Sequence, residues 1–164
     1  MMDGRSMMHV YVIRHGKAED GSETGLDRDR VLRGKGHKQA RWLADMIMSS
    51  EVRPELVLSS PYPRARETAE PIWAALGMDA QIDDRLGAER SMSDMLDVLL
   101  DARGSTCVAI VSHNPNCARI VSTLCNGIMS VPGGHRTGEL AHVRVDDAEL
   151  VGNGELVERL RMGD

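Results

Sequence analysis

The chain has 164 residues, which corresponds to about one domain at roughly 150 residues per domain. Its 20 basic and 25 acidic side chains give a formal net charge of −5, whereas a general nucleic-acid binder needs a basic face. With two Trp, two Tyr and no Phe, the chain also lacks the aromatic platforms on which single-stranded bases stack. Nucleic acid is therefore excluded as the expected partner.

No apolar run approaches the roughly 20 residues that a membrane-spanning helix requires, so no membrane association is expected. The three cysteines, Cys107, Cys117 and Cys125, lack a C-x-x-C pair, which favours buried reduced thiols over a disulfide framework or a zinc knuckle. Reduced thiols are typical of the cytosol, and we predict a cytoplasmic protein. Residues 1–8 carry no signal-peptide pattern, and we expect a disordered N-terminal extension before one domain at residues 9–164.

Short apolar, β-branched segments predict three strands buried on both faces, at residues 9–13, 56–58 and 108–111. Amphipathic helices are expected at residues 36–48, 65–76, 92–100 and around 120–124. Two later segments, 140–145 and 155–160, are expected to pair antiparallel across a Gly-Asn-Gly turn. This order predicts an α/β fold, a single three-layer domain with a mostly parallel central sheet and an antiparallel C-terminal edge.

Polar residues with catalytic potential stand near the end of each apolar strand. The first strand ends at Arg14 and His15, the second precedes Arg64, and the third ends at His113. In open α/β sheets the ligand site lies beyond the carboxyl ends of the strands, so these four side chains are expected to converge. The polar stretch at 17–34 is predicted to be a long surface loop with a functional role.

Two arginines and two histidines suit phosphoryl chemistry. The guanidinium fork matches a dianionic phosphoryl group bidentately. A neutral imidazole can attack phosphorus and carry the phosphoryl group, and a second imidazole can donate to an equatorial oxygen. The sequence has no nucleotide-binding P-loop and no clear metal-ligand spacing, so we expect neither a cofactor nor a metal.

The sequence resembles the histidine phosphatase superfamily, the phosphoglycerate-mutase-like enzymes, at four blocks in the family's order. These blocks are Arg14-His15-Gly16, Asp27-x-x-Arg30-x-Leu32-x-x-x-Gly36-x-x-Gln39-Ala40, Ser59-Ser60-Pro61-x-x-Arg64-Ala65-x-x-Thr68 and Val111-Ser112-His113-Asn114-Pro115. They cover roughly residues 9–125. The short chain and the Ser-His-Asn-Pro block are similar to the small SixA-type phosphohistidine phosphatases rather than to the longer mutases.

The resemblance implies that His15 is the nucleophile that becomes phosphorylated. It implies that Arg14 and Arg64 clamp the phosphoryl oxygens and that His113 completes the phosphate-binding pocket. Many members of the superfamily also present a carboxylate that protonates the leaving group, and Glu89 is the candidate here. Arg85 and Arg90 are close to Glu89 in the sequence, so the alternative is that Glu89 is only part of a solvated ion pair.

The predicted activity is metal-independent hydrolysis of phosphohistidine, a phosphoramidate, on a protein through a covalent phosphohistidine intermediate. The weak signal for Glu89 favours this substrate, because an already protonated imidazole leaving group needs little help from an acid. One alternative is a small-molecule phosphomonoesterase or mutase of the same superfamily, acting on a small phosphorylated substrate. Another is a phosphate-recognising module without turnover, which the retained His15 disfavours.

Several further residues are secondary candidates. Arg30 and either Ser22 or Thr24 are expected to line the entrance of the pocket. Asn114 either braces the His113 loop or caps the following helix. Two further features remain open: the glycine-rich loop with His135 could contact phosphate, and the basic group Arg33, Lys35, Lys38 and Arg41 is either a solvated helix face or a partner surface.

Overall fold

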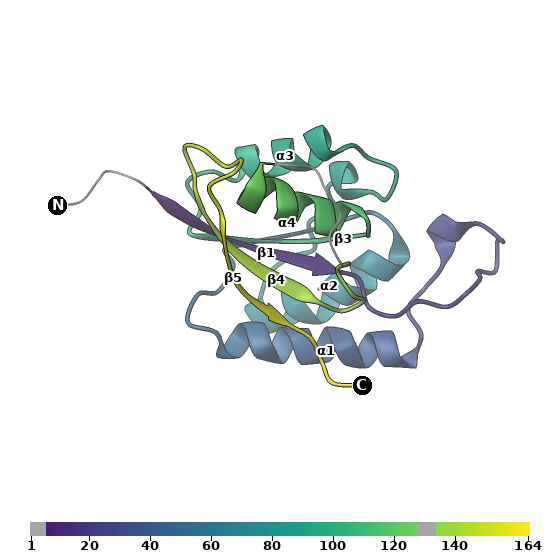
Figure 1. Cartoon of the computed structure of the whole chain (residues 1–164). Coiled ribbons are helices and arrows are strands. Elements are labelled where there is room, and N and C mark those ends of the chain that lie inside the picture. The colour runs from purple at the N-terminus through teal and green to yellow at the C-terminus, as the bar shows by residue number, and fades with distance from the viewer. Residues whose placement is uncertain (1–5, 128–133) are drawn as a thin grey trace.

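A central β-sheet lies between two layers of helices in a computed structural model that describes residues 6–127 and 134–164 (Figure 1). The strands of the described residues are β1 (Met7–Arg14), β2 (Leu56–Ser59), β3 (Cys107–Ser112), β4 (Leu140–Asp146) and β5 (Glu155–Leu160). The helices there are α1 (Gly34–Ser49), α2 (Pro63–Leu76), α3 (Met92–Asp101) and α4 (Asn116–Asn126). None of these helices is both long and apolar enough to cross a membrane.

The sheet has the strand order β2-β3-β1-β4-β5. β1 and β2 both pair parallel with β3, whereas β4 pairs antiparallel with β1 and with β5. The sheet is therefore mixed, with its parallel strands on one side and an antiparallel C-terminal edge on the other. This arrangement confirms the predicted fold class.

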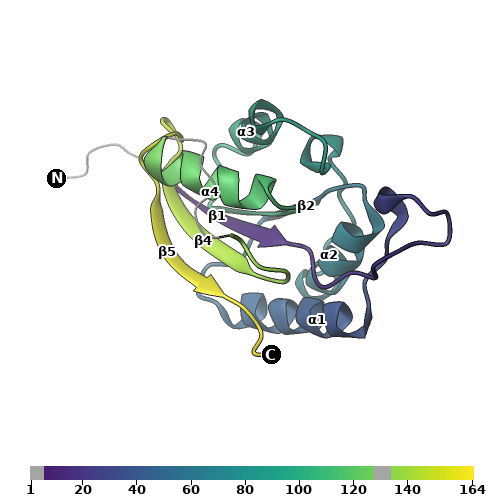
Figure 2. The same cartoon turned by 45° about the vertical axis from the view of Figure 1, so that its right-hand side comes forward.

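The central strand β1 divides the core into two parts, because successive side chains of a strand point to opposite faces. Val10 and Val12 pack into the cluster that contains residues of α3 and α4. Tyr11 and Ile13 pack into the cluster with residues of α1 and α2. Figures 1 and 2 show these helix pairs on opposite faces of the sheet, so the predicted two-sided burial of β1 is confirmed.

The N-terminal boundary was predicted too late. Met7 and Met8 were assigned to a disordered extension, but both belong to β1 and pair with Asp146 and Val145 of β4. Met8 is fully buried in the core, so its thioether side chain gains more from packing than from solvent. Of the rest of the predicted extension, Ser6 accepts a hydrogen bond from the Asp147 amide at 2.9 Å, and residues 1–5 lie outside the described residues.

The three parallel strands end at one edge of the sheet. Arg14 at the end of β1 lies beside Ser112 of β3, and Ser59 at the end of β2 lies beside Val111. The residues that follow these strand ends are His15, Ser60 and His113. Residues 17–33 then connect β1 to α1 and project beyond the same edge (Figure 2).

A close backbone contact joins the residues after β1 to the start of α1. A Cβ atom on Gly36 would lie 2.2 Å from the carbonyl oxygen of Lys17, and one on Gly16 would lie 2.7 Å from the carbonyl oxygen of Gly36. Only glycine fits at such separations. The buried Gln39 side chain strengthens the contact, because its Oε1 accepts a hydrogen bond from the Lys17 amide at 2.8 Å.

We predict that Gly36→Ala lowers the free energy of unfolding by about 1–3 kcal/mol, because the added methyl group forces the Lys17 backbone away. The matched control is Gly34→Ala in the same helix, where an added Cβ meets nothing within 4 Å. That control is expected to leave stability unchanged or raise it by up to about 1 kcal/mol. Urea denaturation of the two variants measures the difference, and equal stabilities would contradict the prediction.

Candidate active site

His15 lies immediately after β1 and is held on both its backbone and its ring. Its amide donates to the Ser112 carbonyl of β3 at 3.1 Å. Its Nδ1 lies 2.7 Å from the carbonyl oxygen of Gly16, and the Gly16 amide donates to Thr68 Oγ1 of α2 at 3.0 Å. These bonds fix the ring between two strands and one helix.

The Gly16 contact determines which ring nitrogen of His15 is protonated. A carbonyl oxygen only accepts hydrogen bonds, so Nδ1 must carry the proton, and Nε2 of the neutral ring is unprotonated. Arg64 Nε donates toward that nitrogen at 3.3 Å. The structure therefore presents His15 Nε2 as a nucleophilic atom beside a guanidinium group.

Arg64, in the first turn of α2, is buried and has partners for all three of its guanidinium nitrogens. Besides its bond to His15, its terminal nitrogens donate to the Asp27 carbonyl oxygen at 2.8 Å and to Asp27 Oδ2 at 3.1 Å. Asp27 belongs to a short 3₁₀ turn in the 17–33 loop. A hydrogen bond from Arg30 holds the pKa of Asp27 below its usual value, so the carboxylate is ionised beside both arginines.

Arg14 is oriented by the chain segment before β4. Its Nη1 donates to the His135 carbonyl oxygen at 2.9 Å, and the Asn114 side-chain amide donates to the same oxygen at 2.8 Å. Arg14 Nε is buried and has no hydrogen-bond partner among the described residues. Arg14 thus retains an uncommitted donor at the strand end.

His113 follows β3, and the centre of its ring lies 5.2 Å from that of His15. Its Nε2 lies 2.7 Å from Ser60 Oγ, whereas its Nδ1 is buried without a hydrogen-bond partner among the described residues. The four predicted residues are thus brought to one edge of the sheet. Their side chains come from two strand ends, those of β1 and β3, and from the helix α2.

Burial is the main reason that both histidines are neutral. Desolvation, followed by the charges of Arg64 and Arg14, lowers the pKa of His15 to about 4 against the opposing hydrogen bond to Gly16. Desolvation, followed by His15 and Arg64, lowers the pKa of His113 to about 2. At neutral pH the site therefore combines two uncharged imidazoles with two guanidinium cations.

Glu89 lies near the site but is committed to Tyr62. The Tyr62 hydroxyl donates to Glu89 Oε2, and the Tyr62 ring centre lies 4.8 Å from that of His113. This hydrogen bond holds the pKa of Glu89 below its usual value, so the exposed carboxylate carries no proton at neutral pH. The guanidinium carbon of Arg64 lies 5.1 Å from the centre of the Tyr62 ring, which links the Tyr62–Glu89 pair to the arginine.

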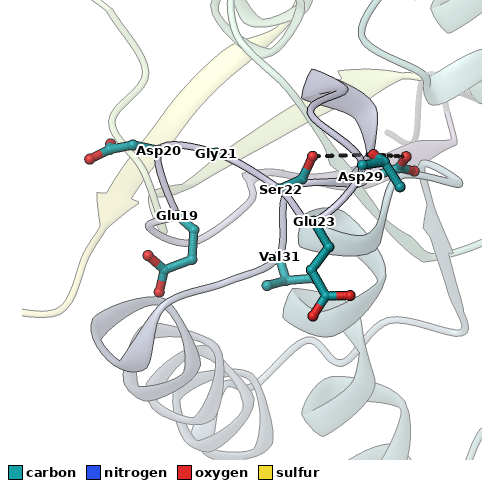
Figure 3. A pocket seen from close by; sticks show the side chains of 8 residues that line it. Glu19, Asp20, Gly21, Ser22, Glu23, Asp29 and Val31 are labelled. Atoms are coloured by element: carbon teal, nitrogen blue, oxygen red, sulfur yellow. Dashed lines mark hydrogen bonds between the residues drawn. The ribbon is translucent and has the colours of Figure 1, made fainter.

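The entrance residues occupy the projecting loop. Arg30 donates to the Glu19 carbonyl oxygen and to Asp27, next to Arg64. Ser22 and Thr24 instead hydrogen-bond to Leu26 and Asp29 within the loop, where they line a hollow with acidic walls (Figure 3). None of the four predicted catalytic residues lines this hollow.

Asn114 contacts both the following helix and the segment before β4, although the N-cap position of α4 is Pro115. Its Oδ1 accepts from the Ala118 amide of α4 at 3.3 Å, while its amide nitrogen holds the His135 carbonyl oxygen. The His135 ring lies against the Glu139 carbonyl oxygen at 2.9 Å, so the backbone of His135, not its ring, contacts Arg14. Residues 128–133 of that glycine-rich segment lie outside the described residues.

Basic residues near α1 have acidic partners. Arg33 forms ion pairs with Glu19 and Asp20, and Lys35 forms one with the C-terminal residue Asp164. These contacts favour a solvated, ion-paired surface over a partner surface for this part of the basic group.

Four contributing residues were not assigned a role from the sequence: Ser60, Tyr62, Thr68 and Asp27. Ser60, Thr68 and Asp27 occupy named positions of the family blocks, and that was the only signal for them in the sequence. Tyr62 occupies an unspecified position of a block, so no signal in the sequence pointed to it. Its contacts depend on how the start of α2 packs against the end of β3.

Within residues 6–127 and 134–164, no group of three or more His, Cys, Asp or Glu residues is arranged to hold a metal ion. The polar groups at this edge are cationic or neutral donors around the unprotonated Nε2 of His15, as in phosphoryl-transfer sites that use side-chain cations. The fold and the site are those of an α/β phosphatase with two histidines and two arginines at the edge where its parallel strands end.

The chain belongs to the histidine phosphatase superfamily (branch 1), whose family model matches residues 10–103. The phosphohistidine phosphatase SixA of Escherichia coli strain K12 is 30% identical over 152 residues, covering 90% of this chain and 89% of that protein. The solved structure of the protein histidine phosphatase SixA complexed with tungstate matches with a TM-score of 0.81 and 27% identity, covering 94% of this chain and 97% of that chain. A mycobacterial glucosyl-3-phosphoglycerate phosphatase shares the fold with a TM-score of 0.69 and 16% identity, covering 93% and 98%.

We predict that stability falls when the pH is lowered from 7.5 to 5. The pKa values of His15 and His113 lie below the unfolded value of about 6.5, so the unfolded state binds more protons in this range. The free energy of unfolding is expected to fall by on the order of 1 kcal/mol per pH unit for each ring.

Urea denaturation at several pH values measures this slope. His113→Asn is expected to make it shallower but not flat, because burial also lowers the pKa values of His9 and His142. A wild-type protein whose stability does not change between pH 7.5 and 5 would contradict the assigned neutral state of the rings.

Proposed function

We propose that this phosphatase hydrolyses phosphohistidine on a protein, without a metal, through a phosphorylated His15. The observation that carries the proposal is the unprotonated Nε2 of His15, oriented by Gly16 and flanked by Arg64 and His113. Arg14 and Arg64 are proposed to bind the phosphoryl oxygens, and His113 is proposed to donate to one of them. The similarity to SixA supports the same substrate class.

The proposed reaction has two steps. First, the Nε2 lone pair of His15 attacks phosphorus, the P–N bond of the substrate breaks, and the bonding pair leaves with the substrate imidazole. A substrate ring that is already protonated on its other nitrogen leaves as neutral imidazole. In the second step, water attacks phosphorus, the P–Nε2 bond breaks, its electrons return to His15, and both water hydrogens leave on the released phosphate.

The ionised state of Glu89 favours a phosphoramidate over a phosphoester. An alkoxide or phenoxide leaving group requires a proton, and a carboxylate held below its usual pKa does not carry one at neutral pH. An imidazole leaving group makes no such demand. A small-molecule phosphomonoesterase remains the second candidate function, because the Tyr62–Glu89 pair lies beside His113 and the fold is shared with a glucosyl-3-phosphoglycerate phosphatase.

The cytoplasm is the proposed compartment. Cys107, Cys117 and Cys125 are all free thiols, and burial raises the pKa of Cys107 and Cys117 to about 12. Such thiols are protonated and inert, as expected for small apolar residues in a reducing environment.

We predict that His15→Ala lowers the hydrolysis rate of phosphoramidate and of para-nitrophenyl phosphate by on the order of 10³-fold or more, because the nucleophile is removed. The wild-type rate is expected to be unchanged by a metal chelator. Rapid denaturation of wild-type protein during turnover is expected to trap an acid-labile, base-stable phosphoryl group on His15.

His37→Ala is the matched control, because His37 is an exposed histidine paired with Glu67 on the outer side of α1 and α2. Its activity should equal that of the wild type. Full activity of His15→Ala would exclude His15 as the nucleophile, and loss of activity with chelator would exclude metal independence.

We predict that Glu89→Gln changes the rate with a phosphoramidate by less than about tenfold, because its leaving group needs no general acid. The same variant is tested on phenyl phosphate, whose phenolate leaving group is a strong base. Glu70→Gln, on the exposed side of α2, is the control. A loss on the order of 10²-fold or more confined to phenyl phosphate would show that Glu89 protonates ester leaving groups, and a loss of that size with the phosphoramidate would contradict the prediction.

A further inference from the structure

The hydroxyl group of Ser60 contacts the second histidine of the site. Ser60 directly follows β2 and is fully buried. Its Oγ lies 2.7 Å from His113 Nε2 and accepts a hydrogen bond from the Tyr62 amide at 3.2 Å. One side chain thus connects the end of β2, the start of α2 and the His113 ring.

Counting hydrogens assigns the direction of the Ser60–His113 bond. A serine hydroxyl has one hydrogen to donate, and the Tyr62 amide uses one of its two acceptor positions. Among the described residues, Ser60 Oγ has no acceptor other than His113 Nε2. Pointing the hydroxyl hydrogen at Nε2 is the arrangement that gives it an acceptor, and Nε2 is then the unprotonated nitrogen.

The direction of this bond determines the state of the other ring nitrogen. Because a neutral imidazole carries one proton, His113 carries it on Nδ1. This Nδ1 is buried and has no hydrogen-bond partner among the described residues, although buried donors normally have one. The ring to which it belongs lies 5.2 Å from the ring of His15. An oxygen of the group transferred to His15 would satisfy this donor.

We propose that Ser60 is a positioning residue that holds His113 in the tautomer protonated on Nδ1 and so reserves that N–H for a phosphoryl oxygen. The binding of a phosphoryl oxygen by this N–H rests on the proposed function. The assignment of the tautomer stands on the geometry of Ser60, Tyr62 and His113 alone. Without the hydroxyl group, His113 is free to carry its proton on Nε2, which leaves Nδ1 as an acceptor that repels the phosphoryl oxygens.

The neighbouring Ser59 provides a matched control. It is as fully buried as Ser60, but its Oγ donates to the Ser60 carbonyl oxygen at 2.9 Å and, within the part of the chain that the structure describes, hydrogen-bonds to neither His15 nor His113. Ser59→Ala and Ser60→Ala therefore remove the same group from adjacent buried positions. Only the second removes the donor to His113.

The first readout is the protonation of the His113 ring, measured by long-range ¹H–¹⁵N NMR correlation at neutral pH. In the wild type and in Ser59→Ala, Nδ1 is expected to be protonated and Nε2 unprotonated. In Ser60→Ala, the ring is expected to shift toward the other tautomer. A wild-type ring protonated on Nε2, or an unchanged tautomer in Ser60→Ala, would overturn the inference.

The second readout is steady-state kinetics with a phosphoramidate. Ser60→Ala is expected to lower kcat by on the order of tenfold to 10²-fold. This loss lies between that caused by removing one ordinary hydrogen bond and that caused by removing one oxyanion donor. KM is expected to change less than kcat, because the donor acts mainly in the transition state. Ser60→Thr keeps the hydroxyl group and is expected to recover most of kcat together with the wild-type tautomer.

These readouts separate the inference from the function on which it rests. If the wild-type protein does not hydrolyse phosphoramidate or phosphoester, the proposed function fails, while the NMR result still decides the tautomer. If the wild type is active and Ser60→Ala retains its full kcat, the proposed function stands and the role of Ser60 is wrong.

Discussion

The site depends on keeping one nitrogen lone pair free among positive charges. His15 Nε2 lies 3.3 Å from the guanidinium of Arg64, and Arg14 adjoins it in sequence. Burial disfavours the charged form of the ring, and the neighbouring cations repel a proton from it further, so the imidazole remains neutral. In the proposed function, the same cations attract the phosphoryl group that this nitrogen attacks. One electrostatic arrangement would then serve both the proposed nucleophile and the proposed binding of substrate.

This arrangement requires a rigid support, because a neutral imidazole exposes the correct nitrogen only when the other one is held. The Gly16 carbonyl oxygen holds Nδ1, and the Gly16 amide is in turn fixed by Thr68. The close approach of Gly16 and Gly36 joins this segment to α1. Gly16 and Gly36 of the family blocks thus serve the packing that orients His15, the proposed nucleophile.

The cations of the site are balanced by neighbouring acceptors in the structure. Asp27 binds Arg64 from the projecting loop, and the His135 carbonyl oxygen is shared by Arg14 and Asn114. In the proposed function, a phosphoryl group would meet guanidinium groups whose orientation is already fixed, which reduces the entropy lost on binding. The projecting loop thereby contributes to the site through the contact between Asp27 and Arg64.

The sequence by itself determined the order of strands and helices, the edge at which the site forms and the four side chains gathered there. Apolar periodicity and the position of polar residues after strands are local properties, and they are visible in one dimension. The tertiary structure decided the hydrogen-bond partners in and around the site: Ser60 with His113, Asp27 with Arg64, and Tyr62 with Glu89. It also placed Met7 and Met8 in β1, because their strand partner in β4 is distant in the sequence. Hydrogen-bond partners and burial, and with them the pKa of each ring, depend on atoms brought together only by folding.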